Sequence, residues 1–366
     1  MTVVSFQVGT KIVTGSGSLS QIGAELTNVG ARRVAVVADR GVAEVGLLDR
    51  ILASAGAVQV VHTTLVDPNP DVATAEQAAR EAISTGCDAV LAIGGGSGLG
   101  AAKAVAIRLT NSDPITAYEG TGRVPKRPAP TVAVPTTAGS GSEVSNALVL
   151  HEPGRDREII VRGPGCEPTV AILDGAVLRD LPRTPMLYAA LDALTHAMEA
   201  LWARGRSRFT DALAVAAADT ILEALPRALE DRDDDTLQRL LDASSAANLA
   251  CGSSGLGLVH ALSSAPSVAL PHGYQNGVLL PHVAQFNRDV LDHAHRHYIE
   301  NIEQFYDQVG FAGYFESGQL NEATLAGMLA AATGHPFRAN NARSSSDGEL
   351  LAILRDAGVA HQEVPL

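Results

Sequence analysis

The sequence predicts a chain of two unlike halves, an α/β domain with a parallel sheet followed by an all-helical domain. In the first half, short apolar runs alternate with Ala-rich segments of helical length, a pattern typical of a parallel sheet covered by helices. Beyond Leu181-Pro-Arg-Thr-Pro185, β-branched runs become rare and long Ala/Leu-rich stretches dominate. We therefore expect two domains, 1–181 and 182–366.

The predicted strands of the first half are apolar throughout. Runs without polar alternation are typical of parallel strands that are buried on both faces. They occupy 34–39, 58–61, 89–93, 131–134 and 170–173. Helices are predicted at 73–85 and 101–109, and the opening segment 3–13 is expected to form a small hairpin or edge strands.

The second half is predicted to consist of helices. They span 186–203, 210–229, 236–251, 256–265 and 277–308. The segment 334–347 is polar and is expected to be irregular, and a last helix is predicted at 348–357.

Composition and charge disfavour several classes of protein. Of 366 residues, 46% are apolar and 18% charged, and the formal net charge is −13, which disfavours binding to nucleic acid or anionic membranes. Three scattered cysteines without a CxxC pair favour a reducing compartment over a disulfide framework. We recognise no signal peptide and no apolar run near the roughly 18 residues of a membrane span. We expect a cytoplasmic homodimer that acts on a small molecule.

Two loops that follow predicted strands are suited to phosphate binding. Gly94-Gly-Gly-Ser97 lies between a buried strand and a helix, where glycines allow close approach and the helix N-terminus offers N–H groups. Pro135-Thr-Thr-Ala-Gly-Ser-Gly-Ser142 offers four hydroxyls after another strand. Each loop alone could be a turn without a ligand, but two at the same sheet edge favour a shared phosphate cradle. Asp39 ends an early strand, and it either binds an adenosine ribose or is a solvated carboxylate.

Four side chains in the second half form a candidate metal site. Asp192 and His196 are four residues apart in an apolar helix, so both lie on one face. His260 lies in a second apolar helix, and His272 follows a proline. One carboxylate and three imidazoles can hold zinc or iron(II) and leave a position open for substrate. Hydrogen-bonded core histidines are the alternative.

With these motifs, the chain resembles the iron-containing (group III) alcohol dehydrogenases over residues 5–285. The resemblance rests on the order and spacing of several motifs. They are Pro135-Thr-Thr-Ala-Gly-Ser-Gly-Ser-Glu-Val144, Leu191-Asp-Ala-Leu-Thr-His-Ala-Met-Glu-Ala200, Gly255-Leu-Gly-Leu-Val-His-Ala-Leu262, Pro271-His-Gly273 and Leu279-Leu-Pro-His282. The family fold is dehydroquinate synthase-like, with a Rossmann-like nucleotide-binding domain before a helical domain.

The resemblance also implies roles for individual residues. The metal ligands, which form the catalytic centre, would be Asp192, His196, His260 and His272. The NAD(H) site would comprise Asp39, Asn69, Gly95, Gly96, Ser97, Thr136, Thr137, Ser140 and Ser142, and Asp39 would favour NAD over NADP. The implied reaction interconverts a small aldehyde or ketone and its alcohol, with Fe²⁺ or Zn²⁺ polarising the carbonyl and nicotinamide C4 carrying the hydride.

The sequence departs from the family pattern at four points. Gly100 stands where an aspartate is usual, Glu158 where a lysine is usual, and Ser264 where a histidine is usual. The interval of 12 residues from His260 to His272 is also short. These changes leave the substrate open.

Three alternatives follow from these departures and from the fold. Maleylacetate reductases carry the same glycine as Gly100, but they typically lack the aspartate found here as Asp192. A sugar-phosphate cyclase such as dehydroquinate synthase shares the architecture, although the run 135–142 argues against it. The third alternative is a binding scaffold without redox activity.

Overall fold

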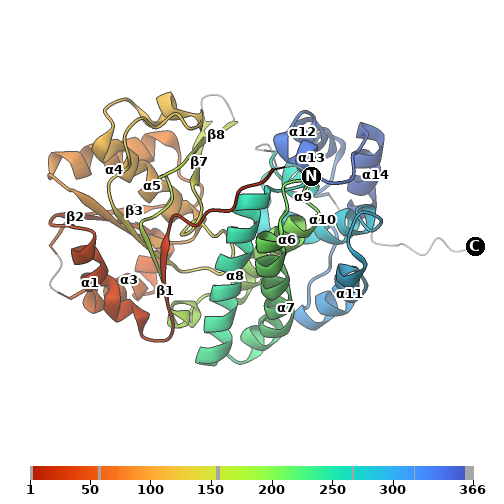
Figure 1. Ribbon diagram of the computed structural model, residues 1–366, viewed down its shortest axis with the longest axis horizontal. Helices are drawn as coiled ribbons and strands as arrows, with labels where there is room; N and C mark the ends of the chain where they lie inside the picture. Colours follow the sequence, from red (N-terminus) through yellow and green to blue (C-terminus); the bar gives the residue numbers. More distant parts are fainter. Residues whose placement is uncertain (1–2, 57–58, 154–156, 266–267, 317, 359–366) are drawn as a thin grey trace, which may run out of the picture. The chain divides into compact units, whose positions relative to one another are not determined.

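The computed structural model describes residues 3–56, 59–153, 157–265, 268–316 and 318–358 (Figure 1). The chain forms two compact units. The α/β unit comprises Gln7–Pro182 and Arg232–Ser245, and the helical unit comprises Met1–Phe6, Arg183–Asp231 and Ala246–Leu366. Among the described residues, no helix is both long and apolar enough to cross a membrane.

The α/β unit is built on a six-stranded sheet in which all the strand pairs are parallel. The order is β1-β9-β6-β4-β2-β3. The bounds are Lys11–Thr14 (β1), Val34–Asp39 (β2), Val60–Val66 (β3), Ala89–Gly94 (β4), Thr131–Pro135 (β6) and Val170–Leu173 (β9). Every residue of β4, β6 and β9 is buried, which confirms the parallel sheet predicted from uninterrupted apolar runs.

Helices cover both faces of this sheet. Figure 1 shows α4 and α5 on one side and α1 and α3 on the other. Their bounds, with those of the short elements between them, are η1 Ser18–Gln21, α1 Ile22–Asn28, α2 Arg40–Glu44, α3 Leu47–Ser54, α4 Val72–Ser84, α5 Gly96–Thr110, η2 Ile115–Tyr118 and η4 Gly175–Leu178. The core beneath α5 combines small residues with branched ones, such as Ala35, Val90, Ala102 and Val105, so the helix backbone packs close to the sheet.

The structure differs from the expected strands at several places. The described part of the run predicted at 58–61 includes the start of β3, which continues to Val66 and is mostly exposed or half-buried rather than buried on both faces. Of the two alternatives for the segment 3–13, a small hairpin or edge strands, the structure shows an edge strand, β1, which begins only at Lys11. A second sheet of order β5-β8-β7 was not predicted; its strands are Gly120–Thr121 (β5), Arg157–Arg162 (β8) and Ala147–Glu152 (β7). β7 alternates buried Leu148 and Leu150 with exposed Val149, the pattern of a half-exposed antiparallel strand rather than of a doubly buried one.

The helical unit contains helices near each predicted stretch and two that were not predicted, over 322–332 and 336–340. The helices are α6 Arg183–Leu201, α7 Arg208–Glu230, α8 Asp234–Ser254, α9 Leu258–Leu262, α10 His272–Phe286, α11 His297–Val309, α12 Glu322–Ala332, α13 Pro336–Asn340 and α14 Asp347–Gly358. The residues of α8 up to Ser245 belong to the α/β unit. α7 begins with a capping box between Ser207 and Thr210, which satisfies free N–H groups of its first turn.

Two helical predictions were wrong in detail. The stretch 277–308 is not one helix, because α10 ends at Phe286 and η5 (His293–His295) precedes α11. The segment 334–347 is not wholly irregular, because it contains α13. Pro336 opens α13, and the His335 ring accepts a hydrogen bond from Phe337 N at 3.2 Å, a side-chain cap that composition does not reveal.

The interior of α5 allows a test of one departure from the family pattern. A Cβ at Gly100 would meet its nearest neighbour, the Val149 carbonyl oxygen, at 3.6 Å, an ordinary contact. Because glycine is unfavourable inside helices, Gly100→Ala should raise the free energy of unfolding by about 0.5–1 kcal/mol, measured by urea denaturation.

The matched control is Gly98, two residues earlier in the same helix. A Cβ there would lie 2.7 Å from Asp39 Oδ1 and 3.0 Å from the Ile93 carbonyl oxygen, so Gly98→Ala should destabilise the protein. A loss of stability in Gly100→Ala as large as that in Gly98→Ala would contradict the prediction.

Candidate functional site

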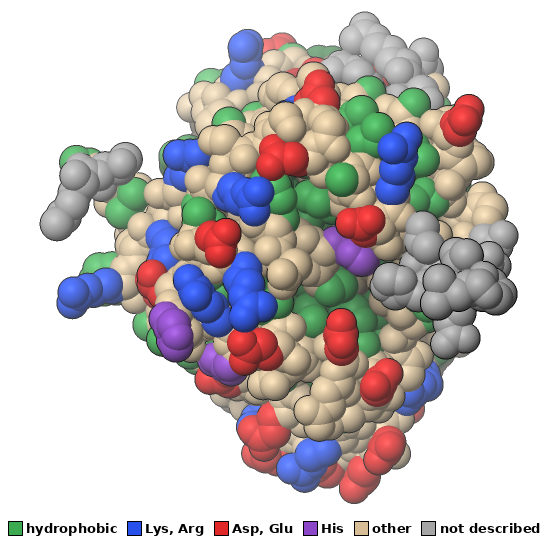
Figure 2. Space-filling model, turned by 90° about the vertical axis from the view of Figure 1, so that its right-hand side faces the viewer, with side chains coloured by type: hydrophobic (Ala, Val, Ile, Leu, Met, Phe, Trp, Pro, Cys, Tyr) green, Lys and Arg blue, Asp and Glu red, His purple; other side chains and the backbone are tan. Residues whose placement is uncertain are grey.

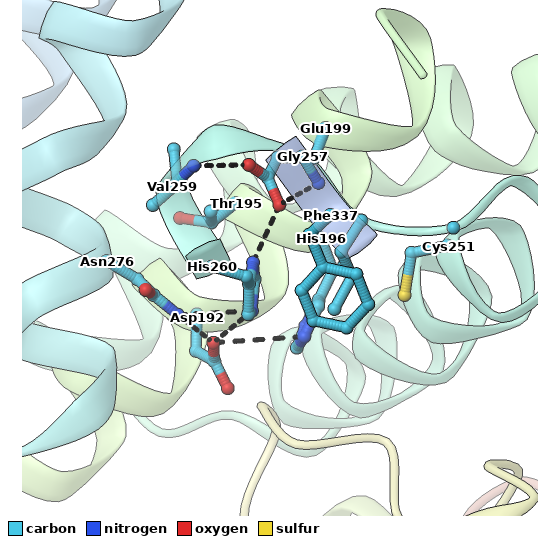
Figure 3. Close-up of polar contacts among 12 residues, drawn as sticks. Asp192, Thr195, His196, Glu199, Cys251, Gly257, Val259, His260, Asn276 and Phe337 are labelled. Atoms are coloured by element: carbon cyan, nitrogen blue, oxygen red, sulfur yellow. Dashed lines mark hydrogen bonds and ion pairs between the residues drawn. The ribbon is translucent and has the colours of Figure 1, made fainter. Parts of the chain in front are cut away.

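Three helices of the helical unit carry the predicted metal ligands, and Figure 3 shows three of these residues, Asp192, His196 and His260. α6 carries Asp192 and His196 one turn apart, α9 carries His260, and His272 begins α10. Asp192 Oδ1 lies 3.5 Å from His260 Nε2, 3.8 Å from His272 Nε2 and 3.9 Å from His196 Nε2. Asp192 therefore lies near all three predicted histidines, and the group of mutually close ligand atoms comprises Asp192, His260 and His272, with His196 beside it.

This cluster fits a divalent metal. Ligand atoms of Asp192, His260 and His272 lie within 4.8 Å of one another. Ligands about 2.1 Å from a tetrahedral metal are separated by about 3.4 Å, so small movements would complete the site. Asp192, His196 and His260 are buried, whereas the His272 side chain is 50% exposed. The cluster is therefore open beside His272.

A buried carboxylate supports one ligand from behind. Glu199 is fully buried on α6. Its carboxylate accepts hydrogen bonds from His260 Nδ1 at 2.7 Å and from the backbone N–H groups of Gly257 and Val259 at 2.9 and 2.6 Å (Figure 3). With Nδ1 engaged, Nε2 of His260 faces Asp192, which is the carboxylate–histidine arrangement common behind protein metals.

The charges of the cluster favour a cation. Burial would raise the pKa of Asp192, but the neighbouring histidines, His196 foremost, outweigh it and hold this pKa well below its usual range. Burial lowers the pKa of His196 to about 4, so its ring is neutral at pH 7, the form that binds metals. Burial also acts to lower the pKa of His260, but the Glu199 and Asp192 carboxylates outweigh it and raise this pKa to about 9.

In the α/β unit, the two predicted phosphate loops lie against each other. Gly95 precedes α5 after β4, and Thr137 follows the neighbouring strand β6. A Cβ at Gly95 would lie 3.1 Å from Thr137 Oγ1, and one at Gly96 would lie 3.2 Å from Ser140 Cβ. The glycines are needed because the loops approach this closely.

The other predicted cofactor residues lie in and around the same loops. Ser97 Oγ accepts a hydrogen bond from the Asn69 backbone at 3.1 Å, and Asn69 adopts a left-handed φ of 54°. Thr136 N donates to the Gly94 carbonyl at 2.9 Å. Ser142 is buried, and its N–H lies 3.4 Å from Ser140 Oγ. The structure thus gathers the predicted nucleotide residues in one unit.

Asp39 caps the glycine-rich turn directly. Its Oδ2 accepts a hydrogen bond from Gly95 N at 2.6 Å. Burial raises its pKa, against the opposing effect of the Gly95 and Gly98 backbone amides. Asp39 also lines a cavity of about 350 Å³, of a size and character suited to a small ligand. The cavity wall includes Val42, Val45, Leu47, Val66, Val177, Leu181, Ser97, Thr136 and Thr137.

Two models of known protein families together match most of the chain. Residues 9–175 match the model for "Iron-containing alcohol dehydrogenase", and residues 186–301 match "Fe-containing alcohol dehydrogenase family, C-terminal". The chain belongs to the iron-containing alcohol dehydrogenase family. The family confirms the oxidoreductase class predicted from the motifs.

Individual relatives agree with this assignment. The chain is 36% identical over 293 residues to "Probable alcohol dehydrogenase EutG" of Escherichia coli (strain K12), covering 79% of this chain and 74% of the relative. It is 32% identical over 291 residues to "NAD-dependent methanol dehydrogenase" of Bacillus methanolicus, covering 78% and 76%. The solved sulfoacetaldehyde reductase from Bifidobacterium kashiwanohense, in complex with NAD+, superposes with a TM-score of 0.89 at 25% identity, covering 98% and 100%.

Three departures from the family pattern have a defined structural setting. Gly100 is buried in α5. Glu158 lies on β8 opposite His151 of β7. Ser264 Oγ donates a hydrogen bond to the Ala261 carbonyl at 2.8 Å, so this hydroxyl is engaged at the end of α9.

Two residues of the site were missed by sequence reasoning, Glu199 and Asn276. Glu199 follows Asp192 by seven residues, which places it on the same helix face. Asn276 follows His272 by one turn on α10, is fully buried, and donates a hydrogen bond to Asp192 Oδ1 at 2.7 Å. A buried charge in an apolar helix and a polar side chain one turn from a ligand were the available signals.

The geometry of Glu199 predicts an effect on metal affinity. Glu199→Gln keeps the size of the side chain but replaces one carboxylate oxygen by an N–H2 group. Because the atoms around Glu199 are N–H donors, this group would face a donor and the orientation of the His260 ring would be lost. We expect Zn²⁺ affinity to fall by about 10–100-fold, measured by competition with a chromophoric chelator. Glu143→Gln is the control, because Glu143 is also buried but contacts Ser245 Oγ in the α/β unit. Equal affinities in wild type and Glu199→Gln would contradict the prediction.

Proposed function

We propose that this chain is a metal- and NAD(H)-dependent oxidoreductase that interconverts a small aldehyde or ketone and its alcohol. The observation that carries the proposal is the placement of three histidines within 3.5–3.9 Å of Asp192 Oδ1 in the helical unit. Family membership and the two adjoining phosphate loops of the α/β unit support it.

The four converging residues would hold the metal, which is either iron(II) or zinc. When bound, the metal supplies Lewis acidity toward a carbonyl or alkoxide oxygen. Glu199 holds Nδ1 of the His260 ring, so Nε2 is directed toward the site and would coordinate the metal. The exposed His272 leaves the cluster open on one side, where a small substrate can enter.

The α/β unit would hold the nicotinamide cofactor, which carries the hydride. The cavity beside Asp39 has mainly apolar walls, suited to an adenosine. The Asp39 carboxylate would repel a 2′-phosphate, so we propose NAD(H) rather than NADP(H). The NAD-dependent relative from Bacillus methanolicus is consistent with this choice.

Proton delivery would not use a histidine at position 264. Ser264 does not titrate near neutral pH, and its hydroxyl hydrogen is engaged with the Ala261 carbonyl. This contact favours a packing role for Ser264 and leaves water, Ser263 or the cofactor ribose to protonate the alkoxide. The reaction rate should then lack the titration of a histidine at this position.

The function is tested with protein reconstituted with Fe²⁺ or Zn²⁺ and a panel of short aldehydes. We expect aldehyde-dependent loss of NADH absorbance in the wild type. Because His260 would be a ligand, His260→Ala should lose bound metal and lower turnover by more than about 100-fold. His297→Ala, which alters an exposed histidine of α11, should retain both metal and turnover.

The same assay separates the alternatives. Turnover without net NADH consumption would indicate a sugar-phosphate cyclase, and no turnover with any substrate would indicate a binding scaffold. Turnover of maleylacetate alone would favour that branch of the family. Full metal content in His260→Ala would contradict the ligand assignment.

Cofactor preference gives a separate prediction. Asp39→Gly removes the charge that would repel a 2′-phosphate, so the ratio of kcat/KM for NADPH over NADH should rise by about tenfold or more. Asp39→Asn is the matched variant, because it removes the charge but keeps an acceptor for Gly95 N. It should shift the preference in the same direction. A wild type that already prefers NADPH would refute this role of Asp39.

A further inference from the structure

The side-chain amide of Asn276 lies among the candidate ligand atoms. Its Nδ2 is 2.7 Å from Asp192 Oδ1 and 3.2 Å from His260 Nε2 (Figure 3). It is also 3.0 Å from His272 Nε2. The residue is fully buried. It lies one turn after His272 on α10, so one helix supplies both a candidate ligand and a contact to the others.

The chemistry of the contacts fixes the orientation of this amide. All three neighbouring atoms can present lone pairs, and a carboxylate oxygen only accepts. The reverse orientation would place two oxygens 2.7 Å apart. In the orientation found, Asn276 Oδ1 is buried without a hydrogen-bond partner among the described residues. The Asn276 side chain thus contacts the cluster through its N–H2 group and leaves its oxygen atom without a hydrogen bond among the described residues.

We propose that Asn276 is a positioning residue of the metal centre. Its two N–H hydrogens would hold Asp192 and His272, the two nearest contacts, together before a cation binds, and the longer contact of 3.2 Å places the amide beside His260. Once the imidazole lone pairs bind the metal, the shortest contact remains and orients the Asp192 carboxylate. The inference rests on the metal centre proposed above.

The tautomer of His260 agrees with this role. Glu199 accepts from Nδ1 of the ring, so in the neutral, metal-binding tautomer Nε2 carries a lone pair. When a metal binds, that lone pair would coordinate it, while Glu199 holds the opposite ring nitrogen. Glu199 and Asn276 thus contact opposite nitrogens of the same imidazole.

The first test is Asn276→Leu in the full chain. The variant removes the donor and keeps a side chain of similar size. We expect Zn²⁺ affinity, measured by chelator competition, to fall by about 10–100-fold. The visible absorption of the Co²⁺-loaded protein should also change, because the Asp192 carboxylate would bind with a different orientation.

Asn287→Leu is the matched control. Asn287 is also fully buried and directly follows α10, but its amide pairs with the Asn341 amide at 2.8 and 3.1 Å. This variant should lose stability while keeping the Zn²⁺ affinity and Co²⁺ spectrum of the wild type. Equal losses of affinity in the Asn276 and Asn287 variants would overturn the proposal, since destabilisation alone would then explain both.

Asn276→Asp keeps the inference testable if the leucine variant does not fold. It places a second carboxylate beside Asp192, so the metal-free protein should lose stability that a bound cation restores. The rise in Tm on adding Zn²⁺ should therefore exceed that of the wild type. An unchanged rise, or wild-type affinity in Asn276→Leu, would overturn the role of Asn276.

The wild type separates this inference from the proposed function. Absence of Zn²⁺ or Fe²⁺ binding by the wild type would overturn the metal centre and the role of Asn276 with it. Tight binding that is unchanged in Asn276→Leu would overturn the role of Asn276 alone. Affinity for NADH, measured by fluorescence, should be equal in all variants, because the predicted nucleotide residues belong to the α/β unit.

Discussion

Two carboxylates buried on one apolar helix impose the main constraint on the helical unit. Asp192 and Glu199 are 7% and 0% exposed on α6. An ionised carboxylate in such surroundings is costly unless hydrogen bonds and positive charge compensate it. The contacts found are with imidazoles, an amide and backbone N–H groups. Residues of α9 and α10 supply most of these contacts.

The start of α9 shows how this constraint shapes the backbone. Glu199 accepts hydrogen bonds from Gly257, the N-cap of α9, and from Val259 in its first turn, N–H groups that lack partners within a helix. A Cβ at Gly257 would lie 2.9 Å from Glu199 Oε1, so a larger residue would push the carboxylate away. The same contact that satisfies the helix end therefore orients His260.

The α/β unit uses a similar arrangement at its own glycine-rich turn. Asp39 accepts from Gly95 N before the first turn of α5, so one N–H of the predicted phosphate site is already engaged. A bound pyrophosphate would use the remaining N–H groups and the hydroxyls of the adjoining loop. On the face shown in Figure 2, acidic and basic side chains are interspersed rather than gathered in one basic patch. Anion binding at this turn would use oriented backbone N–H and hydroxyl groups.

The sequence predicted best the elements whose residue pattern has a single physical explanation. Uninterrupted apolar runs identified β2, β4, β6 and β9, because strands buried on both faces need them. The i, i+4 pair of Asp192 and His196 identified one face of α6. Glu199 was missed because its partners lie 58 to 61 residues away, and spacing does not reveal which helix start will meet a buried carboxylate. The sheet of β5, β7 and β8 was missed because its strands alternate and one has two residues.

The interval of 12 residues from His260 to His272 is short, yet the candidate ligands lie close together. They do so because packing against α6 fixes the position of α10. A Cβ at Gly273 would clash with the Tyr188 carbonyl oxygen, and one at Gly277 would lie 2.8 Å from a methyl carbon of Leu191. These glycines, one turn apart, bring the α10 backbone directly against α6. His272 and Asn276 each directly precede one of them, so the packing that needs glycine also directs these side chains toward Asp192. A change in the length of the preceding segment can therefore alter the surroundings of His272 without displacing it from the ligand cluster.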